Sequence, residues 1–192
     1  MSIRLAIAII LLFTTVYSVT SIREYVIRKD FFRFVKASEY TIYDRTGKKV
    51  LYRIESQFSL LHKIKLIAYP SKKEVGHLNA EIKFLYYQAQ FSIVDSETNQ
   101  RQDGSIVQDA KFLKDIHLIH WKGKNITMET KPFSVTTEFR DPMNGEFLAE
   151  FHLRPASIFW TRKYDMKIYS YAYPEQLYFL ALSVCDLKYR KS

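Results

Sequence analysis

The sequence predicts a mostly β protein, an α+β chain folded as a closed antiparallel β-barrel around one buried carboxyl-terminal helix. From Tyr25 onward, apolar and polar residues alternate with a period of two, which is typical of strands with one buried face. Clusters of turn-forming residues separate these runs. The segment 177–184 is apolar on every side apart from Ser183, so it requires burial all round. A barrel closed around it meets that requirement and removes exposed strand edges.

The predicted strands are short and bounded by turns. Alternation is clearest in three runs, residues 50–55, 64–68 and 147–153. Turns are expected at four places that carry Asp, Asn, Pro or Gly, residues 44–47, 69–72, 95–104 and 141–145. The region 100–131 fits the alternation poorly, and the sequence does not predict its topology.

One helix is predicted over about residues 175–189. Pro174 and Glu175 suit its first turn, because proline has no N–H to leave unpaired and a carboxylate complements the positive helix end. Basic residues from Lys188 onward suit the last turn. The apolar part, 177–187, is too short to cross a bilayer, which needs about 20 residues.

The composition is that of one globular domain. The 192 residues are 47% hydrophobic and include five Gly and five Pro, which excludes a disordered or collagen-like chain. A single cysteine, Cys185, excludes an internal disulfide and a zinc site built from cysteines. The fold is therefore expected to be held by packing alone.

The amino terminus is typical of a secretory signal peptide over residues 1–18. Arg4 precedes an unbroken apolar run, 5–13, and Val16 and Ser18 suit the minus-three and minus-one positions of a cleavage after Ser18. Two alternatives stay open. The segment is an uncleaved anchor, which the basic residues just after it favour, or it is a buried strand of a cytosolic protein.

Asn125 begins an N-glycosylation sequon, Asn125-Ile126-Thr127. Such a sequon is used only in an exposed segment of a chain that enters the secretory pathway. It agrees with the leader, although three-residue patterns also arise by chance. We therefore expect a glycoprotein that is secreted or lies in the lumen of the secretory pathway, with membrane anchoring by the amino-terminal segment as the alternative.

Two parts of the chain resemble LURP-one-related proteins of the tubby carboxyl-terminal-like superfamily. The first comprises Tyr25–Phe32, Tyr40–Asp44, the turn at Gly47 and Val50–Ile54, and the second is the apolar segment Leu177–Asp186. The resemblance covers about residues 24–190 and implies one domain, a twelve-stranded barrel wrapped around a central carboxyl-terminal helix. Tubby proteins bind a phosphoinositide and scramblases act at membranes. No lipid-contacting or calcium-binding residue of theirs maps onto this chain, so the resemblance carries over no activity.

No residue pattern indicates catalysis or a cofactor. His117 and His120 have a spacing that would share a helix face, but on a strand they point to opposite faces, so no metal site is expected. Asp115 and His117 are interpreted as polar residues on the outer surface of the barrel. Cys185 lies in the apolar helix, where a thiol is inert. Because the nucleophile elbow, the phosphate-binding loop and the dinucleotide-binding glycine run are all missing from the sequence, we expect neither catalytic residues nor a cofactor.

The net charge of +9 gives one candidate site. If the strands run up and down, alternate turns meet at one rim of the barrel, which would gather the basic residues Lys48, Lys49, Lys72, Lys73 and Arg101. Such a rim would attract anionic lipid headgroups. The simpler alternative is that these lysines are solvated and keep the protein soluble.

The sequence thus predicts a non-enzymatic binding domain, secreted or lumenal, whose partner is an anionic lipid surface or another protein. The alternative is a membrane-associated module, anionic-lipid-binding or scramblase-related, held by its amino-terminal segment. Nucleic acid is not expected, because the aromatic residues follow the strand pattern and the leader directs the chain away from it.

Overall fold

The structure is a computed structural model that describes residues 21–30, 39–57, 62–83, 86–95, 98–109, 115–157 and 161–188. The predicted leader and the cleavage after Ser18 lie outside the described residues. The strands are β1 (Arg23–Lys29), β2 (Tyr40–Asp44), β3 (Val50–Gln57), β4 (His62–Ala68), β5 (Lys73–Lys83), β6 (Tyr86–Val94), β7 (Arg101–Gln108), β8 (Asp115–Trp121), β9 (Lys124–Thr130), β10 (Thr136–Arg140), β11 (Phe147–Leu153) and β12 (Lys163–Ile168). A short 3-10 helix, η1 (Pro155–Ser157), follows β11, and the helix α2 (Glu175–Lys188) follows β12.

The strands form a closed up-and-down barrel. Each strand pairs antiparallel with the next one along the chain, and β1 pairs with both β2 and β12, so that Ile27 stands opposite Ile42 on one side and Tyr164 on the other. The predicted barrel is therefore confirmed. The region 100–131, which the alternation left unassigned, supplies β7, β8 and β9.

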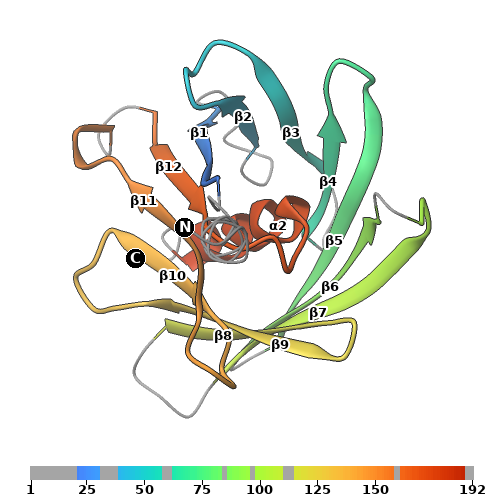
Figure 1. Cartoon of the computed structure of the whole chain (residues 1–192), viewed down its shortest axis with the longest axis vertical. Helices are drawn as coiled ribbons and strands as arrows, with labels where there is room; N and C mark the ends of the chain where they lie inside the picture. Colours follow the sequence, from blue (N-terminus) through green and yellow to red (C-terminus); the bar gives the residue numbers. More distant parts are fainter. Residues whose placement is uncertain are drawn as a thin grey trace, which may run out of the picture.

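Helix α2 lies in the interior of the barrel, and Figure 1 shows it inside the ring of strands. Every side chain from Leu177 to Cys185 is buried, as an all-round apolar helix requires. Phe179 packs against the rings of Tyr25 and Tyr52, at centroid distances of 5.1 and 5.2 Å. The helix begins at Glu175 and ends at Lys188, close to the predicted bounds. No helix among the described residues combines the length and the apolar character needed to cross a membrane.

The first residue of α2 ties the helix to the barrel wall. The Glu175 carboxylate accepts hydrogen bonds from the hydroxyls of Tyr25 and, at 2.7 Å, Tyr52, and Arg23 forms an ion pair with it at 3.3 Å. Burial and the neighbouring Glu175 raise the pKa of both tyrosines well above the ordinary value. The sequence predicted Glu175 as favourable for the helix dipole, and the structure adds its role as the acceptor that fixes the helix to β1 and β3.

Gly104 on β7 is required by a close approach. It pairs with Phe91 on β6, and a Cβ at this position would lie 2.3 Å from the Phe91 ring and 2.7 Å from the carbonyl oxygen of His120. The ring thus occupies the space that a side chain would need. This glycine also interrupts the alternation of β7, which is one reason why the strand was not predicted.

Candidate functional site

The barrel has two ends, and alternate connections meet at each. One end carries the connections β2–β3, β4–β5, β6–β7, β8–β9, β10–β11 and β12–α2, and we name it the basic rim. The other end is named the opposite rim. The chain also enters the barrel at the basic rim, because Arg23 at the start of β1 pairs with Ile168 at the end of β12. All five basic residues singled out in the sequence therefore lie at one end of the molecule.

The β2–β3 turn exposes two of these lysines and neutralises none of their charge. The Asp44 carboxylate is engaged by the turn itself, accepting hydrogen bonds from the Thr46 hydroxyl at 2.9 Å and from the N–H groups of Lys48 and Lys49 at 3.1 Å. Desolvation alone would raise the pKa of Asp44, but these hydrogen bonds outweigh it and hold that pKa below its ordinary value. The side chains of Lys48 and Lys49 are exposed.

The β4–β5 turn places two more lysines beside the first pair. The Tyr69 N–H donates to the carbonyl of Leu51 at 2.8 Å, which holds this turn against the start of β3. Lys72 and Lys73 are both exposed. Among the described residues, none forms an ion pair with Lys48, Lys49, Lys72 or Lys73. These four side chains are named the lysine sector below.

Arg101 lies at the same rim but is held by an acid. Its guanidinium forms an ion pair with Glu74 at 3.1 Å and donates to His77 Nδ1 at 2.9 Å, and Lys65 pairs with the same Glu74 at 2.9 Å. Desolvation opposes ionisation of Glu74, yet Lys65 and Arg101 outweigh it and lower its pKa. Glu74 is thus engaged by Lys65 and Arg101 rather than by the lysine sector. Arg101 is the one predicted rim residue whose charge is already compensated.

Two further basic residues of the rim are paired. Lys122 in the β8–β9 turn forms an ion pair with Asp95 and lies 4.7 Å from the centre of the Trp121 ring. Arg140 at the end of β10 pairs with Glu138 at 3.0 Å. Positive charge that can act on a partner is therefore concentrated over the β2–β3 and β4–β5 turns.

Exposed apolar side chains lie at the same rim as the lysine sector, and the sequence reasoning missed them. Large hydrophobic residues exposed at the basic rim are Ile22 (49%), Tyr171 (58%) and Met143 (90%). Ile22 and Tyr171 flank the junction of β1 and β12, next to the β2–β3 turn, whereas Met143 lies in the β10–β11 turn, on the side of β12 away from the lysine sector. The available signal was a large apolar residue inside a turn, as in Pro142-Met143-Asn144.

Asn125 is exposed but lies on a strand rather than in a loop. It is the second residue of β9, and its side-chain oxygen lies 2.6 Å from Nδ1 of His120. Ile126 is fully buried and points into the barrel, so that Asn125 points outward. The sequon therefore has an accessible side chain.

The histidines face as the strand pattern predicts. On β8, His117 is buried and His120 is exposed, which places them on opposite faces. The interpretation of Asp115 and His117 as outer-surface residues is wrong, because both point into the barrel, with 3.8 Å between His117 Nδ1 and Asp115 Oδ1. They lie on the inward set of β8, together with Ile119 and Trp121. In the described part of the chain, no three His, Cys, Asp or Glu side chains converge on a metal-sized site.

Comparisons with models of protein families, with curated proteins and with solved structures found no match to this chain. The fold and the rim define a class, a closed up-and-down barrel with an enclosed helix and a basic, partly apolar rim. Function is therefore inferred below from the residues of this chain.

Proposed function

We propose that this protein is a non-enzymatic binding domain whose basic rim docks on an anionic membrane surface. The observation that carries the proposal is the lysine sector, four exposed lysines that form no ion pair with a described residue, at the same rim as the exposed side chains of Ile22, Tyr171 and Met143. Cations attract anionic headgroups, and apolar side chains between them insert at the headgroup boundary. Another protein as the partner would not require this combination of free charge and isolated apolar tips.

The magnitudes fit a reversible membrane contact. Each lysine near an anionic surface contributes about 1 kcal/mol, so the lysine sector contributes about 4 kcal/mol. Insertion of three apolar side chains at about 1–2 kcal/mol each adds a similar amount. The sum of about 8 kcal/mol corresponds to a dissociation constant in the micromolar range.

Vesicle co-sedimentation tests the proposal. The full chain should bind vesicles of mixed phosphatidylserine and phosphatidylcholine but not phosphatidylcholine alone, and raising the ionic strength from about 0.05 to about 0.5 M should release it. Replacing Lys48, Lys49, Lys72 and Lys73 by Glu should abolish binding, because it removes at least about 4 kcal/mol.

A matched control makes the same change in net charge at the opposite rim, with Glu at Lys29, Lys63, Lys131 and Lys163. This variant should keep most of the binding. Equal loss in both variants would show that overall charge, and not the lysine sector, holds the membrane, and absence of binding at low salt would refute the proposal.

The exposed apolar side chains of the basic rim allow a second, independent test of membrane binding. Serine at Ile22, Met143 and Tyr171 should weaken vesicle binding while leaving its dependence on salt unchanged, because that dependence comes from the cations. A steeper or shallower salt dependence in this variant would contradict the division of roles between charged and apolar side chains.

We also propose that the protein is secreted or lumenal, with retention by an uncleaved amino-terminal segment as the alternative. The leader and the accessible Asn125 side chain support the first route. Expression of the full chain in a secretory host, followed by intact mass with and without glycosidase, distinguishes them. Protein that begins near Val19 and carries a glycan at Asn125 supports secretion, whereas unprocessed protein in the membrane fraction supports the anchor.

The likeness to LURP-one-related proteins stays a prediction. Its support is that the resemblance implies a twelve-stranded barrel around a carboxyl-terminal helix, which is the architecture of this chain. Fold alone does not convey function, so the membrane proposal rests on the rim residues rather than on the family.

A further inference from the structure

A second site lies at the opposite rim, away from the lysine sector. A cavity of about 250 Å³ opens between the carboxyl-terminal half of α2 and the strands β10, β11 and β12. Leu182 and Cys185 form its inner side, and Phe151, Leu153 and Tyr164 form part of its outer wall. These side chains are apolar or present carbon, so the space is suited to hydrocarbon rather than to ordered water.

The cavity has a sequence-level cause. Helix α2 lines the cavity with Leu182 and the small residue Cys185, whereas its first turns carry Tyr178, Phe179 and Leu180. The number of strands around the helix is the same at both ends of the barrel. The side chains of α2 therefore occupy less of the barrel interior near the opposite rim than near the basic rim. The helix is closely enclosed at its start and leaves space at its end.

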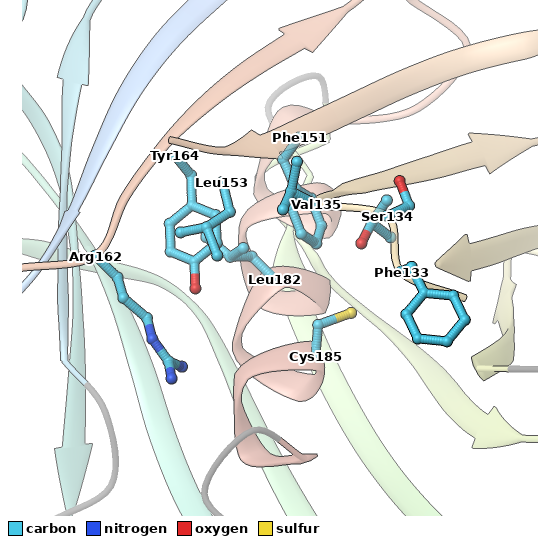
Figure 2. Close-up of a pocket in the computed structure, with 10 residues that line it drawn as sticks. Phe133, Ser134, Val135, Phe151, Leu153, Arg162, Tyr164, Leu182 and Cys185 are labelled. Atoms are coloured by element: carbon cyan, nitrogen blue, oxygen red, sulfur yellow. The ribbon is translucent and has the colours of Figure 1, made fainter. Parts of the chain in front are cut away.

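The mouth of the cavity is bordered by a fully exposed aromatic ring on one side and by a cation on the other. Phe133, in the β9–β10 connection, borders the cavity with its side chain entirely exposed, and its φ of 61° is a conformation that large side chains rarely adopt. Figure 2 shows Phe133 at one edge, Arg162 at the other, and Leu182 and Cys185 of the helix between them. Among the described residues lining the cavity, Arg162 is the one that carries a charge.

From this lining we infer that the cavity binds the aliphatic chain of a fatty acid, with the carboxylate at Arg162. An apolar cavity of about 150 Å³ in another protein accommodates benzene, which has six carbons, so about 250 Å³ corresponds to about ten carbons. A guanidinium recognises a carboxylate through paired hydrogen bonds, whereas a neutral head group would gain less there. This site is separate from the basic rim, so it neither requires nor implies membrane docking.

Calorimetric titration of the full chain with a series of straight-chain acids tests the inference. Affinity should rise about fourfold per methylene, since each buried methylene contributes equally, and it should level off at about the length of decanoate, when the cavity is full. Decanol should bind at least about tenfold more weakly than decanoate, because it lacks the charge. Replacement of Arg162 by Gln should weaken decanoate to the level of decanol and leave decanol unchanged.

A cavity-filling variant tests the location. Cys185→Leu should weaken decanoate binding at least about tenfold while raising Tm, because it fills apolar space. Ser183→Ala, on the same helix but outside the lining, should change neither. In the native chain, bound decanoate should also slow the labelling of Cys185 by a thiol reagent, a readout that does not depend on any variant.

Three results would overturn the inference. Absence of binding by any acid of the series would exclude the ligand class. Equal affinity of decanoate and decanol would exclude Arg162 as the headgroup site. Unchanged decanoate binding in a folded Cys185→Leu protein would place the ligand elsewhere. The Glu variant of the lysine sector should bind decanoate normally, so failure of this inference is distinguishable from failure of the membrane proposal.

Discussion

Removal of one buried hydroxyl should stabilise the barrel. Tyr178 on α2 is fully buried against Phe139, at a centroid distance of 5.1 Å, and its hydroxyl has no hydrogen-bond partner among the described residues. A buried polar group without a partner costs about 1–3 kcal/mol relative to its hydrated state. Tyr178→Phe removes the hydroxyl and keeps the ring, so the free energy of unfolding should rise by about 1 kcal/mol and Tm by about 2–4 °C.

The same substitution at Tyr52 should have the opposite sign. Its hydroxyl donates to the Glu175 carboxylate at 2.7 Å. A hydrogen bond to a charged group contributes about 1.5–3 kcal/mol, and Tyr52 is half-buried, so Tyr52→Phe should destabilise by about 1.5 kcal/mol. Two chemically identical changes thus differ by about 2.5 kcal/mol because one hydroxyl has a partner and the other has none.

Urea unfolding followed by far-ultraviolet circular dichroism measures both. The slope against urea should be the same in the two variants, so that the shift in midpoint reports stability alone. If Tyr178→Phe destabilised the protein as much as Tyr52→Phe does, the Tyr178 hydroxyl would have a partner, an enclosed water for example. The reasoning from the unpaired hydroxyl would then be refuted.

Gly104→Ala should destabilise by about 1–3 kcal/mol through overpacking against Phe91, whereas Gln90→Ala on the exposed face of the neighbouring β6 should change the urea midpoint little, and equal midpoints for both would contradict the close approach. The barrel should also lose stability at alkaline pH, because burial raises the pKa of Tyr87 and Tyr178. The contribution of these two tyrosines to the free energy of unfolding is complete below pH 10. Above pH 10 it falls by up to about 1.4 kcal/mol per pH unit for each tyrosine, because the tyrosines of the unfolded chain ionise first. Urea midpoints that stay constant up to about pH 11 would contradict this loss of stability. In an ultraviolet titration, Tyr169 should ionise at about 12, since burial and the adjacent Glu150 raise its pKa, and Tyr169→Phe should remove that step.

The sequence was most informative where one physical requirement dominates. Residues alternate in β3, β4 and β11 because one face of each strand is exposed to solvent and the other is buried. The helix is apolar on all sides because the barrel encloses it. Strand β7 was not predicted because its inward positions are Gln102, Gly104 and Ile106, of which one is a large apolar residue. At Gly104, the space of an inward side chain is occupied by the ring of Phe91 on β6. A single-strand pattern does not contain that partner.

The sequence was sufficient to predict where the candidate site lies, but not which of its charged side chains form ion pairs. Up-and-down topology and turn positions were enough to bring Lys48 and Lys72 to one rim. The compensation of Arg101 was not predictable, because Glu74 reaches this β7 residue from β5, across the intervening strand β6, and the sequence does not state the registers that allow it. The inward direction of Asp115 was missed for a related reason, since a charged residue at a strand end is usually solvated.

Enclosure of α2 has a consequence for synthesis of the chain. The strands β1 to β12 are made before the 14 residues of α2 that occupy their common interior. Until those residues leave the ribosome, twelve inner faces have nothing to cover them, and β1 must still find β12 at the far end of the chain. Folding of this domain is therefore expected to reach completion only after α2 has left the ribosome, with a dependence on chaperones in the interval and no native-like product from a transcript truncated before Glu175.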